Sequence, residues 1–383
     1  MTLILTIVLL FGSVILAHEF GHFIMARMTG MRVEKFSIGF PPRLLSLKPT
    51  ENGWVLRIFF FKSTESGLKW QPILKFNLSR KFAKSKTEYN FALIPLGGYV
   101  KVAGVIDESF DKKIVGAKDE FSGKNGFQKS LFLLGGVLMN FVLAFVIFSG
   151  IFYHNGIPSD STRIDVATGG PSEIAGIQSG DSLLTISGEI VETWDDLVDV
   201  VRGKPDQNLT IEYFRSNHVF STTVHSDSYE LAGADTVIVI GRIGVIREML
   251  PIGFYQSAIL GAKAINETLG LVVYFVRGLF SGEFNFRKHI GGPITIVNEA
   301  HSALQSGWIK FFYFIAFISV QIGIFNLFPI PGLDGGHLLI VIIESLIRKP
   351  LSLDTRIRIQ QVGLTLLFAL MIYVVFNDIV RLF

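Results

Sequence analysis

The sequence of 383 residues contains no cysteine, which excludes disulfides, iron–sulfur clusters and thiolate zinc sites together. Charge is also scarce: Asp, Glu, Lys and Arg make up 17% of the chain, whereas hydrophobic residues make up 49% and the mean hydropathy is +0.47. This balance is unusual for a soluble protein and favours a membrane protein. Any metal site must use His, Asp or Glu as ligands. The absence of cysteine does not indicate the cellular compartment, because a chain without cysteine suits either side of a membrane.

Four long windows carry almost no charge, and each reaches or approaches the roughly 20 residues that a spanning helix needs. These windows are 3–26 (interrupted only by Glu19), 130–153, 311–330 and 359–377. We expect the first window to be a retained span rather than a cleavable signal peptide, because it lacks a basic amino-terminal region.

The distribution of charge predicts how these spans are oriented. Residues 27–129 contain 19 Lys and Arg against 9 Asp and Glu, whereas residues 154–310 contain 11 against 18. The segment 348–358 is also basic, and basic residues close to helix ends favour the cytoplasmic side. We therefore expect residues 27–129 and 331–358 in the cytoplasm, with 154–310 and both termini outside.

The stretch 254–282 is apolar enough to suggest a fifth span, but Lys263, Glu267 and Arg277 interrupt it. A fifth crossing would also turn the basic segment 348–358 outward. We therefore predict an amphipathic helix that lies on the outer membrane surface.

The first window contains the segment 18–22, which reads His-Glu-Phe-Gly-His. Residues four apart share one face of a helix, so His18 and His22 can bind one metal ion, and Glu19 can act as a general base beside it. Ionisable groups at bilayer depth are costly and usually functional. The alternative is two packed histidines beside a buried glutamate, which requires polar partners for all three groups in apolar surroundings.

Two histidines leave such a site incomplete, so a third ligand is required. The best candidate is Asp334, in the segment 326–337, which reads Asn-Leu-Phe-Pro-Ile-Pro-Gly-Leu-Asp-Gly-Gly-His. Its prolines interrupt the helix and its glycines let the backbone turn sharply, at the same predicted membrane face as His18 and His22. His337 is the rival ligand, although we expect it to begin the next helix or to support the ligands.

The segment 18–22 together with 326–335 resembles the site-2 proteases, the M50 zinc metallopeptidases, and most closely their regulator of sigma-E protease branch. Further similarities lie in the segments 36–40, 95–101 and 291–294. The resemblance implies one Zn²⁺ per chain, held by the two histidines of the first motif and by Asp334, with the intervening glutamate as catalytic base. It also implies that Asn326 helps to hold the substrate backbone or its oxyanion.

The segment 88–103 is rich in Tyr, Phe, Ile and Val, which favour strands, and its glycine pair permits a tight turn. A strand edge here could pair with an unwound substrate. The resemblance implies that role for a membrane-embedded hairpin, and the alternative is a hairpin that only packs at the mouth of the site. The candidate substrate-binding residues are Gly97, Gly98, Tyr99, Asn326, Pro329 and Pro331.

The stretch 46–86 is longer than the resemblance would imply. It includes the apolar run 58–61 and the basic cluster 80–86. We interpret it as a membrane-hugging insertion, and a role in substrate gating is the alternative.

Residues 160–228 resemble one PDZ domain, with alternating strands between glycine turns and a helical apolar spacing at 194–201. Such a module could bind the cut end of a substrate, or act as a size filter against bulky outer domains, which we favour. The predicted division of the chain is 1–153 as the first transmembrane half, 160–228 as the PDZ domain, 229–305 as an extracytoplasmic linker with amphipathic surface helices, and 306–383 as the second transmembrane half.

The sequence thus predicts a polytopic α-helical membrane protein with four transmembrane helices, a membrane-associated β region and an inserted α+β PDZ domain. We expect an intramembrane zinc metalloprotease of the bacterial inner membrane that cuts single-pass proteins; the resemblance implies an anti-sigma factor or remnant signal peptides. The alternatives are a non-catalytic scaffold that presents a PDZ domain, and a zinc-dependent transporter or sensor. Nucleic-acid binding has little support, because anionic lipid is the simpler partner for the basic cluster.

Overall fold

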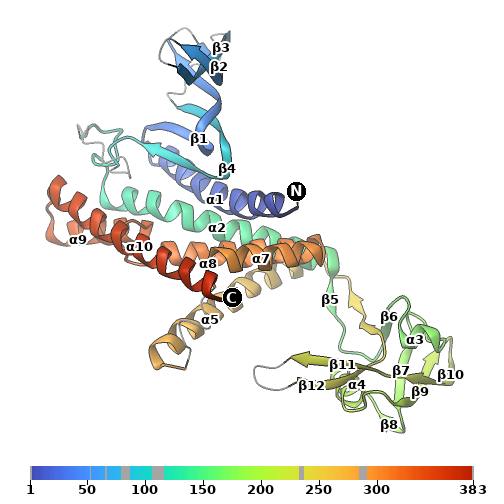
Figure 1. Cartoon of the computed structure of the whole chain (residues 1–383). Helices are drawn as coiled ribbons and strands as arrows, with labels where there is room; N and C mark the ends of the chain where they lie inside the picture. The colour runs from blue at the N-terminus through green and yellow to red at the C-terminus, as the bar shows by residue number, and fades with distance from the viewer. Residues whose placement is uncertain are drawn as a thin grey trace. The chain divides into compact units, whose positions relative to one another are not determined.

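The computed structural model describes residues 2–51, 53–64, 67–78, 87–105, 116–232, 237–283 and 291–381. The chain forms two compact units: Met1–Ser149 with Ala258–Phe383, and Gly150–Ser257 (Figure 1). The predicted basic cluster 80–86 lies outside the described residues.

The first unit is built mainly from long helices. Their bounds are α1 (Thr2–Met28), α2 (Gly126–Asn155), α5 (Phe254–Ser281), α7 (Pro293–Gln305), α8 (Trp308–Asn326), α9 (Asp334–Ile347) and α10 (Leu353–Arg381). Within the described part of the chain, five helices are long and apolar enough to cross a membrane, namely α1, α2, α5, α8 and α10. Four transmembrane helices were expected, and α5 is therefore a fifth candidate. The position of α5 on the membrane surface stays a prediction.

The third predicted window is shorter in the structure than in the sequence. The helix α8 ends at Asn326, because Pro329 and Pro331 follow and cannot continue it. The chain resumes helical structure only at Asp334. The interruption of the helix between Asn326 and Asp334 is therefore confirmed.

Glycines allow α1 and α2 to touch along their backbones. A Cβ atom on Gly21 would collide with the carbonyl oxygen of Gly135, and a Cβ atom on Gly135 would lie 2.7 Å from the carbonyl oxygen of Gly21. Small residues at a helix crossing permit such close approach within a membrane. This crossing lies within the segment 18–22, so it brings α2 directly against the predicted metal motif.

A buried carboxylate joins α10 to the start of α7. Asp378, near the end of α10, accepts hydrogen bonds from the backbone amides of Gly292 (2.8 Å), Ile294 (3.0 Å) and Thr295 (3.2 Å) and from the Thr295 hydroxyl (2.9 Å). It thereby caps the first turn of α7. A Cβ atom on Gly292 would lie 2.5 Å from Asp378 Oδ2, so only a glycine at this position leaves space for the carboxylate.

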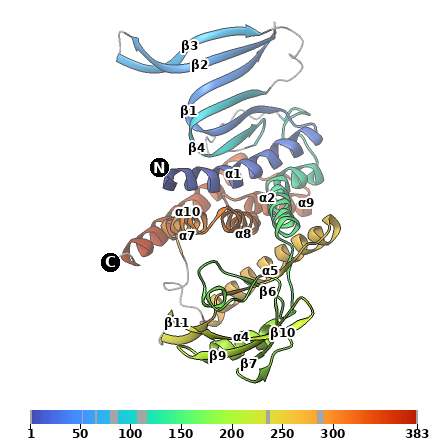
Figure 2. The same cartoon turned by 90° about the vertical axis from the view of Figure 1, so that its right-hand side faces the viewer.

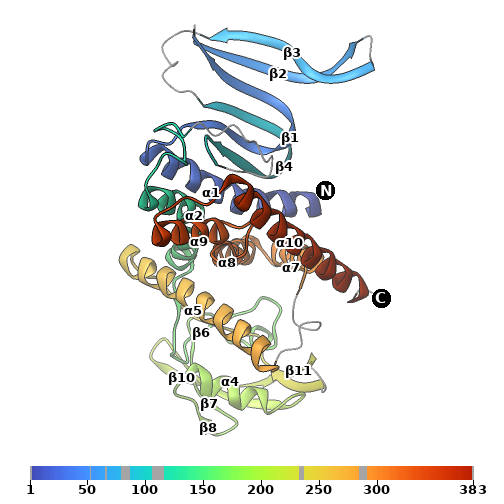
Figure 3. The ribbon, with the colours of Figure 1, turned by 90° about the vertical axis from the view of Figure 1, so that its left-hand side faces the viewer.

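A sheet of four described strands packs on α1, as Figure 2 and Figure 3 show from two sides. Its strands are β1 (Val33–Thr50), β2 (Gly53–Thr64), β3 (Gly67–Leu78) and β4 (Glu88–Val102), in the order β3-β2-β1-β4.

The segment predicted as a hairpin, 88–103, instead forms one bent strand. Both of its ends pair with the same stretch of β1, so that Ile38 has Phe91 as one partner and Gly98 as the other. Gly97 supplies the bend with φ +138°, a conformation that side-chain-bearing residues rarely adopt. A Cβ atom on Gly97 would also lie 2.6 Å from Cγ2 of Ile15 on α1. Gly97 therefore permits close packing on α1, and Gly98 permits the close approach of β1, where a Cβ atom would collide with the carbonyl oxygen of Ser37.

The second unit is an α+β module. Its elements are β5 (Ile157–Pro158), β6 (Ile164–Val166), α3 (Pro171–Ile174), β7 (Ser182–Ile186), β8 (Glu189–Ile190), α4 (Trp194–Arg202), β9 (Asn208–Arg215), β10 (His218–His225), β11 (Asp227–Ala232), β12 (Val237–Arg242), β13 (Val245–Arg247) and β14 (Met249–Leu250). The helix predicted at 194–201 is present as α4. The compact unit also includes β11–β14 and ends at Ser257, beyond the predicted boundary at 228.

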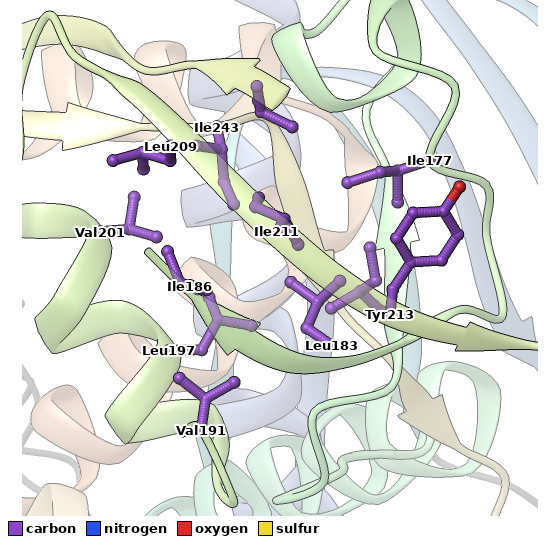
Figure 4. Close-up of a cluster of buried hydrophobic side chains, with 12 residues drawn as sticks. Ile177, Leu183, Ile186, Val191, Leu197, Val201, Leu209, Ile211, Tyr213 and Ile243 are labelled. Carbon is purple, nitrogen blue, oxygen red and sulfur yellow. The ribbon is translucent and has the colours of Figure 1, made fainter. Parts of the chain in front are cut away.

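The core of this unit follows from alternation in the strands. In β9, Leu209, Ile211 and Tyr213 point inward, where they meet Leu197 of α4 and Ile186 of β7 (Figure 4). The helix α4 begins at a capping box, in which Thr193 and Asp196 satisfy each other's backbone amides.

Candidate active site

Three predicted ligand residues converge in the first unit. On α1, Nε2 of His18 and Nε2 of His22 lie 3.2 Å apart, and both imidazoles are buried. Oδ2 of Asp334, at the first residue of α9, lies 3.0 Å from the first of these nitrogens and 3.2 Å from the second. The three side chains form a group whose ligand atoms lie within 4.8 Å of one another.

These atoms fit a zinc ion. Tetrahedral ligands at about 2.0–2.1 Å from zinc are separated from one another by about 3.3 Å, close to the observed spacing. The buried Oδ2 of Asp334 finds no hydrogen-bond donor among the described residues. An ionised carboxylate in such surroundings is costly unless a cation or a donor compensates it. Two imidazoles and one carboxylate also form a donor set that zinc commonly takes.

Glycines fold the loop before Asp334 tightly against two helices. Cβ atoms on Gly335 and Gly336 would collide with the carbonyl oxygens of Leu327 and Ile330 in this loop. A Cβ atom on Gly363 of α10 would collide with the carbonyl oxygen of the loop residue Pro331. The loop can therefore lie where it does only because these residues lack side chains, and Asp334 is placed as a result.

Contacts with α2 orient both imidazoles. Nδ1 of His22 donates to the carbonyl oxygen of Phe132 (2.9 Å), which leaves Nε2 free to bind a metal. The amide of Asn140, which is fully buried, lies 3.3 Å from Nδ1 of His18. Ser319 of α8 donates to the backbone oxygen of Asn140 (2.9 Å) and ties it to a second helix. Both histidines thus have a partner on the side away from Asp334.

Gly136 on α2 provides space for the two imidazoles because it has no side chain. A Cβ atom on Gly136 would lie 2.5 Å from Cε1 of His18 and 2.6 Å from Nε2 of His22. Any side chain at this position would therefore enter the space between the ligands.

The strand β4 reaches Glu19 through its backbone. The amide of Val100 donates to Oε2 of Glu19 (3.0 Å). On its other side, this stretch of β4 pairs with β1, with Phe36 opposite Val100. No further strand of the described chain pairs with residues 98–102, so this edge faces α1 and the ligand group.

The other predicted site residues fall into two groups. Gly97, Gly98 and Tyr99 lie in β4 immediately before Val100, whereas Asn326 ends α8, and Pro329 and Pro331 lie in the loop that leads to Asp334. His337 lies in the first turn of α9 and is outside the ligand group that the described residues form.

Sequence reasoning missed the support that α2 gives to the site. Phe132 acts through a backbone oxygen, which leaves no trace in a sequence. Gly136 and Asn140 did leave a signal in the sequence. They are four residues apart and so share one face of the helix, and a glycine on the same face as a buried amide can indicate a close approach of another helix. These residues lie in the window 130–153, whose sequence predicts only a transmembrane helix.

Comparison with known proteins agrees with this chemistry. The model of peptidase family M50 matches residues 6–67 and 73–370. The chain is 31% identical over 381 residues to a Clostridium perfringens protein named as a candidate zinc metalloprotease, with 97% of each chain covered. It is 29% identical to the zinc metalloprotease RasP of Bacillus licheniformis, with 100% of each chain covered. It is 27% identical to the regulator of sigma-W protease RasP of Bacillus subtilis, with 99% of each covered.

Proposed function

Because the chain belongs to peptidase family M50 and is a zinc metalloprotease of the site-2 type, we propose that it hydrolyses peptide bonds within the transmembrane segments of single-pass membrane proteins. The observation that carries this proposal is the convergence of Asp334 with His18 and His22, which lie with Glu19 on a helix apolar enough to span a membrane. A protease with its site at that depth acts on substrates that enter from the bilayer.

Each residue of the site has a role that its position supports. His18, His22 and Asp334 would hold the Zn²⁺, and when bound this ion would polarise a peptide carbonyl and make water a stronger acid. Glu19 takes a proton from the attacking water and delivers it to the leaving amine. The amide of Val100 fixes Oε2 of Glu19, which leaves Oε1 for this proton transfer.

The edge of β4 is suited to hold the substrate. A peptide must be extended before its carbonyl can be attacked, and an unpaired strand edge binds extended backbone through main-chain hydrogen bonds. We assign this role to Gly97, Gly98 and Tyr99, whose strand runs past Glu19. Asn326 is the last residue of α8 and would hold the scissile backbone or its oxyanion, and Pro329 and Pro331 in the loop after it would also contact the substrate.

The distribution of basic residues supports an orientation in the bacterial inner membrane. In it, residues 27–129 and 331–358 face the cytoplasm, and the second compact unit is extracytoplasmic. This unit would act as one PDZ-like module that screens substrates by size or holds a cut terminus. A relative named as regulator of sigma-W protease makes a membrane-bound anti-sigma factor a reasonable substrate, and remnant signal peptides are a second.

The variant Glu19→Gln tests this proposal. It keeps the size and hydrogen-bond acceptor of the side chain but cannot serve as the base, so zinc content and fold should be retained while cleavage of a transmembrane reporter falls by about 10²-fold or more. The matched control is Glu267→Gln, an exposed glutamate on α5, which should cut like the wild type.

Full activity of Glu19→Gln would refute the assignment of the base. Zinc bound at one ion per chain, without reporter fragments even from the wild type, would instead favour a zinc-dependent transporter or sensor.

A further inference from the structure

The outer part of the β-sheet is amphipathic in a way that the catalytic site does not require. We call the residues 45–50, 53–64 and 67–78 the hairpin sheet; they are the second half of β1 with β2 and β3. Residues that stand opposite each other in neighbouring strands project from the same face. Three such rows are Leu45–Ile58–Leu74, Leu47–Leu56–Phe76 and Pro49–Trp54–Leu78. Every residue of these rows is apolar.

The rows between them project from the opposite face and are largely polar. These rows are Ser46–Arg57–Lys75 and Lys48–Val55–Asn77. From residue 45 to 78 the sequence has five Lys or Arg against two Asp or Glu, so the hairpin sheet is also basic. At its far end, beyond a register shift between Ile58 and Phe59 that separates it from these rows, Lys62 stands directly opposite Lys69. Like charges in that position repel each other unless an external anion compensates them.

Four residues of the apolar face are exposed, whereas Trp54 is buried. Leu74, Phe76 and Leu78 retain 47%, 48% and 46% of their accessible surface, and Leu45 retains 39%. An antiparallel sheet normally buries its apolar face against a core, and a large exposed patch marks an interaction surface. Figure 3 shows that β2 and β3 extend beyond the helices of the same unit.

The apolar face continues onto aromatic residues at the end of α1. Tyr89 stands opposite Leu47 and so belongs to the same face. Its ring lies 6.0 Å from that of Trp54 and 6.2 Å from that of Phe23 on α1. Phe23 is in the last two turns of a helix that is apolar enough to span a membrane. The apolar face therefore begins beside the end of this candidate span.

We propose that the hairpin sheet lies flat in the cytoplasmic leaflet, with its apolar face on the acyl chains and its basic residues bound to anionic phospholipid headgroups. Aromatic rings at the boundary suit this position, since Trp and Tyr favour membrane interfaces. Phe60, Phe61 and Trp70 cluster beside Lys62 and Lys69, at ring separations of 4.9–6.0 Å. The sheet thus anchors β1, and through it β4, at a set depth beside the catalytic site. The inference rests on the proposed topology of the spans.

Single cysteines can test the depth, because the chain has none of its own. Phe76→Cys and Lys75→Cys are neighbours on opposite faces, and Val142→Cys, exposed on α2, reports on the span. The full-length protein, one copy per nanodisc that contains phosphatidylglycerol, is spin-labelled at each site. We expect oxygen to relax the labels at 76 and 142 more than a water-soluble nickel chelate does, and the reverse at 75.

Other outcomes overturn the proposal in distinguishable ways. Nickel access at 76 with oxygen access at 142 would leave the topology intact and place the hairpin sheet in water. Nickel access at both 76 and 142 would refute the topology itself. Shielding of 76 from both reagents would mean that protein covers this face.

The headgroup contact has its own test. Lys48→Gln, Arg57→Gln and Lys75→Gln are combined, and the phosphatidylglycerol that copurifies with the protein is measured. Each cation removed should weaken the association by about fivefold. The control combines Arg202→Gln, Lys204→Gln and Arg242→Gln in the second compact unit, and should retain the lipid. Equal retention by both triple variants would overturn the headgroup assignment.

Discussion

Gly136 of α2 faces the imidazole of His18 so closely that a Cβ atom would lie 2.5 Å from its Cε1. Real Cβ atoms do not approach other atoms this closely, so Gly136→Ala must displace an imidazole. We expect the zinc content of the purified protein after dialysis to fall about tenfold or more, and reporter cleavage to fall with it.

Gly150→Ala is the matched control for this variant. It lies on the same helix, and a Cβ atom there meets nothing within 4 Å. Its zinc content and activity should equal those of the wild type. Retention of zinc by Gly136→Ala would show that α2 can move away from the ligands without cost.

Asn140 is expected to orient His18. Rotation of its amide by 180° brings Oδ1, which otherwise has no partner among the described residues, toward Nδ1 of His18. The nitrogen would then donate, leaving Nε2 free for the metal. Asn140→Leu removes this acceptor and should lower zinc affinity by about 10–100-fold, measured by competition with a chelator.

Asn140→Asp restores an acceptor oxygen and should recover most of that zinc affinity. Recovery would distinguish orientation of the ring from simple packing, because leucine and aspartate both fill the space. Equal affinity in the leucine variant and the wild type would contradict the role.

Asp334→Asn tests the third ligand. The amide keeps the shape of the side chain but removes the negative charge that zinc requires of this ligand, so zinc should be lost on dialysis. Asp354→Asn, an exposed aspartate in the first turn of α10, is the control and should keep its zinc. Unchanged metal content in Asp334→Asn would point to another ligand, with His337 as the first to examine.

Asp378 should hold α7 and α10 together. Asp378→Ala leaves three backbone amides of the α7 amino terminus without an acceptor, at a cost of about 1–3 kcal/mol. We expect a lower thermal midpoint in detergent and faster hydrogen exchange in residues 293–305. Glu299→Ala, on the exposed side of α7, should change neither. Unchanged exchange in Asp378→Ala would show that packing alone secures the helix.

Much of the site could be predicted from local patterns. The spacing of His18 and His22 implies a shared helix face, and the prolines before Asp334 imply an interrupted helix, because both consequences act over a few residues. The partner of segment 88–103 could not be predicted in this way. Its strand-forming residues do not say that they pair with 33–40 rather than with one another.

The helices, the two histidines on one face, the base between them and the break before Asp334 can all be derived from the amino-acid sequence, since backbone periodicity and the rigidity of proline act locally. The three-dimensional packing was needed to show that Gly136 makes room for the imidazoles, that Asn140 lies behind His18, and that Val100 binds Glu19. These contacts join residues from 81 to 122 positions apart. They depend on how closely whole helices and strands approach one another, which no local pattern specifies.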